Sequence, residues 1–240
     1  MLDGSSSPGS LCVIGVMHRR RLREVYRSAG WPCQDAVEVE LIAAGLLVRE
    51  RDGLGHETLR VSDAGIAVLA ETLARNRARR DAHELLVERI AHETTRAGRL
   101  AWRGLAVRVH VGEQWQIAMP DVFSVRHTSV EAYLEPIVHE VKVRRSDLLA
   151  DLRRASKREA YLQLGGECWY AIRSGIAEPD EIPAECGVLI AQEGRLVVAR
   201  SAVHRALPRM PFAVWMALAK AQPVAGFDDD LQGLLSGFED

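Results

Sequence analysis

Residues 137–143 read Ile-Val-His-Glu-Val-Lys-Val, an apolar stretch that carries a carboxylate and an ammonium group two positions apart. Side chains in a strand alternate between two faces, so Glu140 and Lys142 would point to the same side. Burying both groups costs free energy unless they pair or bind something charged. The pattern therefore predicts either a salt bridge or a metal and substrate site. Upstream, residues 119–123 read Met-Pro-Asp-Val-Phe, which places a second acid, Asp121, at the start of a second apolar run.

Pro120-Asp121, followed nineteen positions later by Glu140-Val141-Lys142, resembles the PD-(D/E)XK signature of the restriction-endonuclease-like nucleases. The continuation through residue 151, Glu-Val-Lys-Val-Arg-Arg-Ser-Asp-Leu-Leu-Ala-Asp, is similar to the E-[IV]-K-x-x-R-x-D-[FL]-x-x-D run of the MmcB-like DNA repair proteins. Tyr161, an aromatic segment at 168–172 and a Gly-Val-Leu-Ile segment at 187–190 then follow in that family's order. The resemblance covers residues 81–201. The family proteins are usually shorter, and Arg153-Arg154 stands where they carry an aromatic residue.

The resemblance implies an α/β domain over residues 79–222, with a central mixed sheet flanked by helices, that hydrolyses DNA with Mg²⁺ or Mn²⁺. Such an ion neutralises phosphoryl charge and generates hydroxide near neutral pH, and oxygen ligands suit it. Lys142 would orient or deprotonate the water, or stabilise the transition-state charge. The expected catalytic residues are Asp121, Glu140 and Lys142. The expected ligands of the ion are Asp121, Glu140, the carbonyl of Val141 and a helix acid, Glu84, with Glu88 as its substitute.

Basic residues gather directly after the Glu-x-Lys segment. Residues 144–158 hold six bases against two acids, a local surplus that suits a phosphate backbone. We expect a helix capped by Ser146 and ended by Gly165-Gly166 to carry them. The expected DNA contacts are Arg144, Arg145, Arg153, Arg154, Lys157 and Arg158. The expected supporting residues are Asp147, Asp151, Tyr161 and Gln163. Exposed helix glutamates and a plain Glu140–Lys142 surface pair are the structural alternatives.

Residues 11–78 alternate helices with a short hairpin. Helices are expected at 20–28, after a cap at Asp35 and after a cap at Ser62, and strands at 46–50 and 57–61. This order resembles the winged-helix DNA-binding domains. Three acids of the second helix, Asp35, Glu38 and Glu40, stand where a helix entering the major groove normally carries Arg or Asn. A structural or dimerising wing is therefore the alternative to DNA contact.

A charge-rich segment at 75–80 predicts a linker between the two domains. The next helix, at 81–95, would turn Leu85, Leu86, Ile90 and Ala91 inward. Further strands are expected at 105–111, 117–125, 168–172, 187–191 and 196–199. His139 should face the opposite side of its strand from Glu140 and be packed. A last helix at 211–221 should place Phe212, Trp215, Met216 and Leu218 in the core.

Composition narrows the class of protein. Apolar content of 48% and charged content of 27% are ordinary for a globular chain, and the net charge of −2 leaves nucleic-acid binding to local patches. No apolar run approaches the ~20 residues of a membrane span, so no membrane partner is expected. Four cysteines without metal-ligand spacing fit a reducing cytoplasm. Residues 1–10 and 223–240 read as a disordered tail and an acidic tail.

These patterns together predict a bacterial cytoplasmic protein, a winged helix followed by a PD-(D/E)XK domain, that cleaves DNA in repair or a related transaction. DNA is the expected partner, and both a monomer and a homodimer remain open. Two alternative functions also remain: the same fold binding DNA without cleavage, and a winged-helix transcription regulator. The acid–acid–Lys triplet favours the enzyme.

Overall fold

The computed structural model describes residues 13–207 and 209–225. The chain divides into two compact units, residues 1–78 and 79–240. The expected tail at 1–10 and all but the first three residues of the expected acidic tail lie outside the described residues. No helix within the described ranges has both the length and the apolar character needed to cross a bilayer.

The first unit contains two helices, a hairpin and the start of a long helix. Its elements are α1 (Val16–Arg27), α2 (Ala36–Ala43), β1 (Leu47–Arg51), β2 (Glu57–Val61) and α3 (Asp63–Arg96). Asp35 caps α2 by accepting from the amide of Glu38, and the Ser62 hydroxyl accepts from the amide of Gly65 at the start of α3. Both expected caps are thus present, whereas α1 begins four residues earlier than the sequence pattern predicts.

Glu38 does not lie on the surface of α2. Its side chain is fully buried, and one oxygen accepts from the amides of Cys33 and Gln34 while the other faces Arg49 at 3.2 Å. This glutamate therefore ties the loop before α2 to the hairpin. It does not present a negative charge outward, as its place in a surface helix suggested.

α3 runs without interruption from Asp63 to Arg96, so the expected linker at 75–80 is helical. The segment reads Arg-Asn-Arg-Ala-Arg-Arg and contains neither Gly nor Pro. Arg and Ala are among the strongest helix formers, while like-charge neighbours cost only a few tenths of a kcal/mol each. In the second half of the helix Leu86, Ile90 and Ala91 are buried as expected, but Leu85 is exposed and Val87 takes an inward place.

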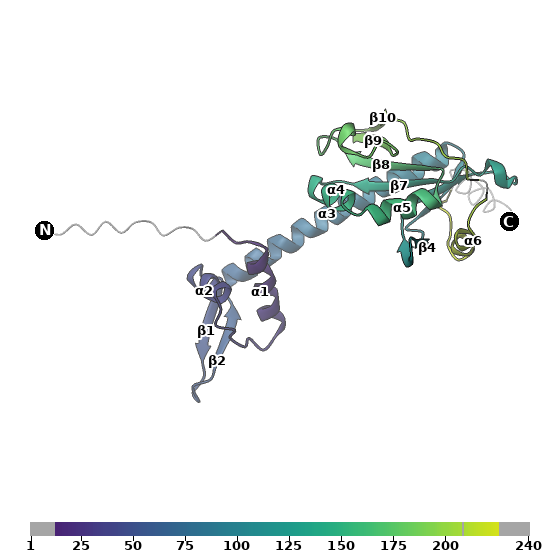
Figure 1. The fold of residues 1–240 in the computed structure, drawn as a ribbon. Coiled ribbons are helices and arrows are strands. Elements are labelled where there is room, and N and C mark those ends of the chain that lie inside the picture. Colours follow the sequence, from purple (N-terminus) through teal and green to yellow (C-terminus); the bar gives the residue numbers. More distant parts are fainter. Residues whose placement is uncertain (1–12, 208, 226–240) are drawn as a thin grey trace, which may run out of the picture. The chain divides into compact units, whose positions relative to one another are not determined.

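The second unit is built on a six-stranded mixed sheet (Figure 1). Its strand order is β10-β9-β8-β7-β6-β3, in which β7, β8 and β9 are parallel and the other pairs antiparallel. The strands are β3 (Arg99–Arg103), β6 (Val122–Arg126), β7 (Ile137–Lys142), β8 (Glu167–Arg173), β9 (Gly187–Gln192) and β10 (Arg195–Arg200). The sequence pattern missed β3, whose Arg-Leu-Ala-Trp-Arg run shows no alternation of apolar and polar residues.

A separate two-stranded hairpin precedes β6. It consists of β4 (Val107–Val111) and β5 (Gln114–Ala118). The expected strand at 117–125 is therefore two strands, because Pro120 interrupts it and has no amide hydrogen for a ladder. The second of these strands joins the main sheet, and the first stays in the hairpin.

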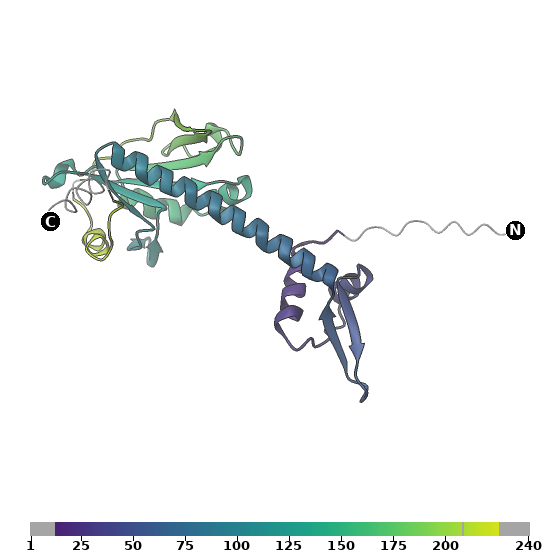
Figure 2. The same ribbon diagram turned by 180° about the vertical axis from the view of Figure 1, so that it is seen from behind.

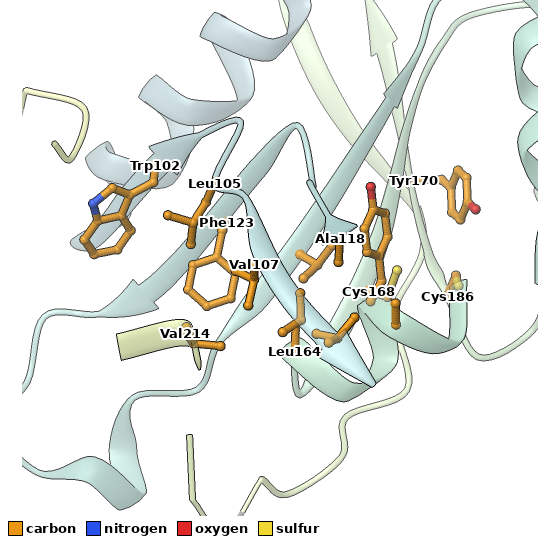
Figure 3. Close-up of a cluster of buried hydrophobic side chains, with 14 of the residues drawn as sticks. Trp102, Leu105, Val107, Ala118, Phe123, Leu164, Cys168, Tyr170, Cys186 and Val214 are labelled. Carbon is orange, nitrogen blue, oxygen red and sulfur yellow. The ribbon is translucent and has the colours of Figure 1, made fainter. Parts of the chain in front are cut away.

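Helices cover both faces of the sheet. Figure 1 shows α4 (Arg145–Leu152) and α5 (Ala155–Leu164) on one face, and Figure 2 shows α3 across the other. The larger core lies on the first face, and Figure 3 shows part of it, with Phe123, Val107 and Val214 gathered together. The smaller core, between the sheet and α3, includes Val141 and Ile90.

The expected single helix after β7 is two helices. α4 begins at Arg145 with Arg144 as its cap, two residues before the predicted cap at Ser146, and the break falls at Arg154 (φ −94°, ψ 73°). No Gly or Pro marks this break in the sequence.

The last helix, α6 (Phe212–Leu218), is less buried than expected. Val214 is buried, whereas Phe212, Trp215 and Met216 are exposed.

Candidate functional site

The site is built where the pairing of β6 with β7 stops. The two strands pair over residues 122–124 and 137–139, and β7 then continues through 140–142, paired with β8. Pro120 would lie opposite the continuing strand, and without an amide hydrogen it cannot extend the ladder. The two strands therefore part at this point, which we call the fork. The Glu-x-Lys segment forms one arm of the fork.

Asp121 bridges the fork with its side chain. Its Oδ2 accepts a hydrogen bond from the amide of Val141 at 2.7 Å, in place of the backbone acceptor that a continued β6 would supply. The backbone carbonyl of Asp121 accepts from Gly104 at 3.1 Å. The hydrogen bond from Val141 to Asp121 brings the Pro-Asp segment to the residue between Glu140 and Lys142, as the sequence spacing predicts.

Glu140 and Lys142 point to the same face and into a buried polar cluster. Oε1 of Glu140 accepts from the Lys142 ammonium and from the Lys157 ammonium of α5, the latter at 2.5 Å. Oε2 accepts from the Tyr161 hydroxyl at 2.8 Å. Lys157 also donates to Asp151 at 2.6 Å, and Asp151 is the last acid of the Glu-x-Lys continuation.

The cluster balances its own charge. Two carboxylates and two ammonium groups share it, and the Tyr170 hydroxyl donates to Asp151 at 2.9 Å. Burial opposes the charge on Lys157, but the carboxylates of Glu140 and Asp151 outweigh it and raise the pKa of the ammonium. Burial likewise opposes the charge on Asp151, but the ammonium groups of Lys142 and Lys157 lower the pKa of that carboxyl. These pairings stabilise charges that would be costly if buried singly.

Burial and the neighbouring carboxylates also act on the two tyrosines. Both raise the pKa of Tyr161, chiefly through burial and then through the charge of Glu140, and the pKa of Tyr170 rises for the same reasons beside Asp151. Both phenols therefore remain protonated donors at neutral pH. The Tyr161 hydroxyl oxygen also lies 3.0 Å from the carbonyl oxygen of Met119, so its single hydrogen is shared between Glu140 and the chain directly before the fork.

Asp121 also lines a pocket of about 500 Å³. It is lined by Glu84 and His83 of α3, by Arg103 and Gly104, and by residues 119–121. The His83 ring lies between two acids, with Nε2 3.5 Å from Asp121 and Nδ1 3.5 Å from Glu84. The contact with Asp121 raises the pKa of His83 against the effect of its burial. The expected helix acid Glu84 thus shares a pocket with Asp121.

The chemistry of these donors fits the expected ion. Mg²⁺ is commonly held by one or two carboxylates together with waters and substrate phosphates, and Glu84 and Asp121 supply two carboxylates at one pocket. All three carboxylates already have partners in the chain. Glu84 accepts from the Arg103 guanidinium at 2.9 Å and Asp121 from the Val141 amide, while Glu140 accepts from two ammonium groups and a phenol. As their side chains are placed, no group of three or more His, Cys, Asp or Glu among the described residues could hold a metal ion.

Some expected residues lie away from the fork. Gln163 is exposed, Asp147 accepts from the Ser146 hydroxyl at 3.4 Å, and Glu88 is exposed beside His92.

The six expected DNA contacts fall into two groups, those paired with carboxylates and those that are exposed. Arg145 pairs with Glu181 and Arg158 with Glu185, while Lys157 turns into the cluster. Arg144, Arg153 and Arg154 are exposed. Three of the six expected contacts therefore have carboxylate partners of their own.

Three residues of the site were missed or misassigned by sequence reasoning. Lys157 was expected to face DNA, and Tyr170 and His83 were not singled out. A signal existed for two of them: His83 directly precedes Glu84, and Lys157 stands four positions before Tyr161 on the same helix face. Tyr170 gave none, because an aromatic in a buried strand normally indicates packing.

Comparison with known proteins gives a structural likeness alone. No protein-family model and no curated protein sequence matches the chain. A solved structure, the SPO1766 protein of unknown function from Silicibacter pomeroyi, is similar over 63% of this chain and 86% of that one, at 22% identity and a TM-score of 0.38. Similarity at this level carries no argument about function.

Proposed function

We propose that the second unit hydrolyses DNA phosphodiester bonds at the fork, with Mg²⁺ or Mn²⁺, as a nuclease of the PD-(D/E)XK type. One observation carries the proposal. The Asp121 carboxylate accepts from the amide between Glu140 and Lys142, which joins the two separated parts of the signature. A six-stranded mixed sheet with helices on both faces is consistent with the fold that this signature implies.

Each residue at the fork then has a definable task. Glu84 and Asp121 would hold the ion, which would neutralise phosphoryl charge and lower the pKa of water. The Val141 amide fixes one oxygen of Asp121, and Glu140, itself held by Tyr161, keeps the Lys142 ammonium in place. Lys142 orients the attacking water or stabilises the negative charge that develops on the phosphoryl group.

The first unit is proposed to be a winged helix that assists this reaction. Its order of two helices, a hairpin and a third helix supports that assignment. Its hairpin arginines are already paired, Arg49 and Arg51 with Glu57 and Arg60 with Glu50. These pairings favour a modest, non-specific contribution to DNA affinity over direct reading of bases.

Incubation of the full chain with plasmid, single-stranded and forked DNA tests the proposal. Each substrate is combined with Mg²⁺, with Mn²⁺ and with EDTA, and products are resolved on gels. We expect cleavage with either ion and none with EDTA. A chain that cleaves none of these substrates, and whose melting temperature does not respond to Mn²⁺, would falsify the nuclease proposal.

A second function is favoured by the lysine pairing. Lys142 and Lys157 neutralise Glu140 and Asp151 within the chain itself. A fold with this internal pairing is suited to bind DNA without cutting it, as an accessory module. The two functions differ in one result, because the accessory module binds DNA equally well in EDTA and in Mn²⁺ and yields no products.

A further inference from the structure

The β4–β5 hairpin has one buried and one exposed face. β4 alternates between buried and exposed side chains, and Val107 and Val109 of β4 and Ala118 of β5 are buried against the core. Side chains on the other face are solvent-exposed. We call this other face the hairpin strip, and it consists of Arg108, His110, Trp115, Ile117 and Met119.

The hairpin strip presents an aromatic ring between two cationic or polar groups. Trp115 is 60% exposed, its ring lies 4.7 Å from the Arg108 guanidinium carbon, and its centroid lies 5.0 Å from that of His110. Ile117 and Met119 extend the apolar surface and are 73% and 57% exposed. Large apolar side chains that gather on one face, beside a cation, are typical of a surface that meets a partner.

The strip leads directly to the proposed active site. Met119 is both its last residue and part of the wall of the 500 Å³ pocket that holds Asp121 and Glu84. The hairpin is also tied to the start of α5, because the Gln116 amide donates to the carbonyl of Ser156 at 2.9 Å. Two exposed arginines, Arg153 and Arg154, immediately precede α5. Positive charge that a phosphate backbone needs is therefore available beside the strip.

We propose that the hairpin strip binds single-stranded DNA, with a base stacked on Trp115 and the strand directed toward the pocket at Asp121. In a duplex the faces of the bases are covered by the neighbouring base pairs, so an exposed indole can stack only on unpaired bases. Arg108, with Arg153 and Arg154, supplies the cations for the phosphates. This inference rests on the proposed nuclease function and adds that its substrate is unpaired DNA.

Fluorescence anisotropy in EDTA, where hydrolysis is blocked, separates binding from cleavage. The probes are a labelled oligothymidine of ~20 nucleotides, longer than the site of a typical single-strand binder, and a duplex of equal length. The variants are Trp115→Ala and Trp115→Phe in the full chain. The control is Tyr133→Ala, which removes an aromatic side chain of similar exposure (62%) from another part of the same unit.

Trp115→Ala should weaken binding of the single strand by about 5- to 150-fold, the scale of one lost stacking interaction. Duplex affinity should not change, Trp115→Phe should recover most of the loss, and Tyr133→Ala should match the wild type. Equal weakening for single strand and duplex, or none for either, overturns the proposal. So does a wild-type dimer that Trp115→Ala dissociates with single-strand affinity unchanged, because the strip would then be an interface between two copies.

The two proposals fail in different ways. Wild-type protein that cleaves nothing, but whose Trp115→Ala variant loses affinity for the single strand, contradicts the nuclease and supports the strip. Wild-type protein that cleaves DNA with Mn²⁺, while Trp115→Ala leaves both affinity and rate unchanged, supports the nuclease and contradicts the strip.

Discussion

The ammonium groups of Lys142 and Lys157 both contact the same oxygen of Glu140. If Glu140 were a ligand of a divalent cation, it would use that oxygen too. Lys157 matters more than Lys142, because it lies on α5, away from the strand of Glu140, and donates to both Glu140 and Asp151. Its pKa is raised, so it remains a cation at neutral pH. At the scale of single residues, Lys157 therefore competes with any ion for Glu140.

Lys157→Met keeps the length of the side chain and removes its charge. It leaves Glu140 and Asp151 one ammonium short, which should lower stability by about 1–3 kcal/mol. Mn²⁺ should then raise the melting temperature of this variant more than that of the wild type, since Glu140 is released. Lys220→Met, at an exposed lysine, is the matched control. A Mn²⁺-induced shift of the Lys157→Met melting temperature that is no larger than that of the wild type would argue against Glu140 as a ligand.

His139 predicts a dependence of stability on pH. It is 7% exposed on the α3 face, beside Arg99, Glu93 and Glu167. Burial, and then the charge of Arg99, lower its pKa to about 3. Below the ordinary histidine pKa of about 6.5, His139 is protonated in the unfolded chain but stays neutral in the folded chain. Stability should therefore be full above about pH 6.5 and fall as the pH drops toward 3, by about 2 kcal/mol at about pH 5.

Urea unfolding between about pH 7.5 and about pH 5, above the range of ordinary carboxyl groups, measures this contribution. His139→Leu should remove most of the slope, since no titrating group remains there. His127→Leu, at an exposed histidine, should keep the wild-type slope. Equal slopes in the wild type and His139→Leu would mean that His139 is not the group responsible.

Residue types and their spacing predicted that Glu140 and Lys142 share one face, because period two places them there whatever surrounds the strand, and left open whether they pair or hold an ion. The buried place of His139 follows from the same rule. The partners Lys157 and Tyr170 could not be predicted in this way. Which cation reaches Glu140 depends on how α5 packs across β7, and that is settled by contacts far apart in the sequence.

At the scale of elements, the first residue of β9 must be a glycine because a side chain there would collide with the neighbouring strand. Gly187 pairs in register with Trp169 of β8, and a Cβ added to it would lie 2.4 Å from the indole ring. Gly187→Ala should therefore destabilise the protein by about 1–3 kcal/mol through overpacking. Gly53→Ala, where a Cβ meets nothing within 4 Å, should be close to neutral. Midpoints of urea unfolding that coincide for the two variants would refute this role.

Most elements could be predicted from the sequence, but two kinds could not. The continuous apolar strand at 187–191 and the helix after the cap at Asp35 came within two residues of their observed ends, and α3 begins directly after its predicted cap at Ser62. The helical course of 75–80 was missed because clustered charge suggests a loop, although each residue favours a helix. β3 was missed because its place at the sheet edge depends on pairing with β6.

At the scale of the whole molecule, charge is arranged locally while the total stays near zero. The net charge of −2 conceals the exposed arginines at the α4–α5 junction and the carboxylates around the pocket of Asp121. A phosphate backbone responds to such local fields, which act over about one Debye length. Binding of DNA by the second unit should accordingly be salt-sensitive despite an acidic chain.

The account depends most directly on Lys142, and one measurement tests it: the rate at which wild type and Lys142→Ala cleave single-stranded DNA in Mn²⁺, with Mn²⁺ binding followed by calorimetry. An ammonium cannot ligate a cation, so the variant should keep at least the Mn²⁺ affinity of the wild type. Its cleavage should fall by about 10²- to 10⁴-fold, and Lys142→Arg should not restore it. Equal rates for wild type and Lys142→Ala, or a wild type that binds no Mn²⁺ and cleaves no DNA, would contradict the account.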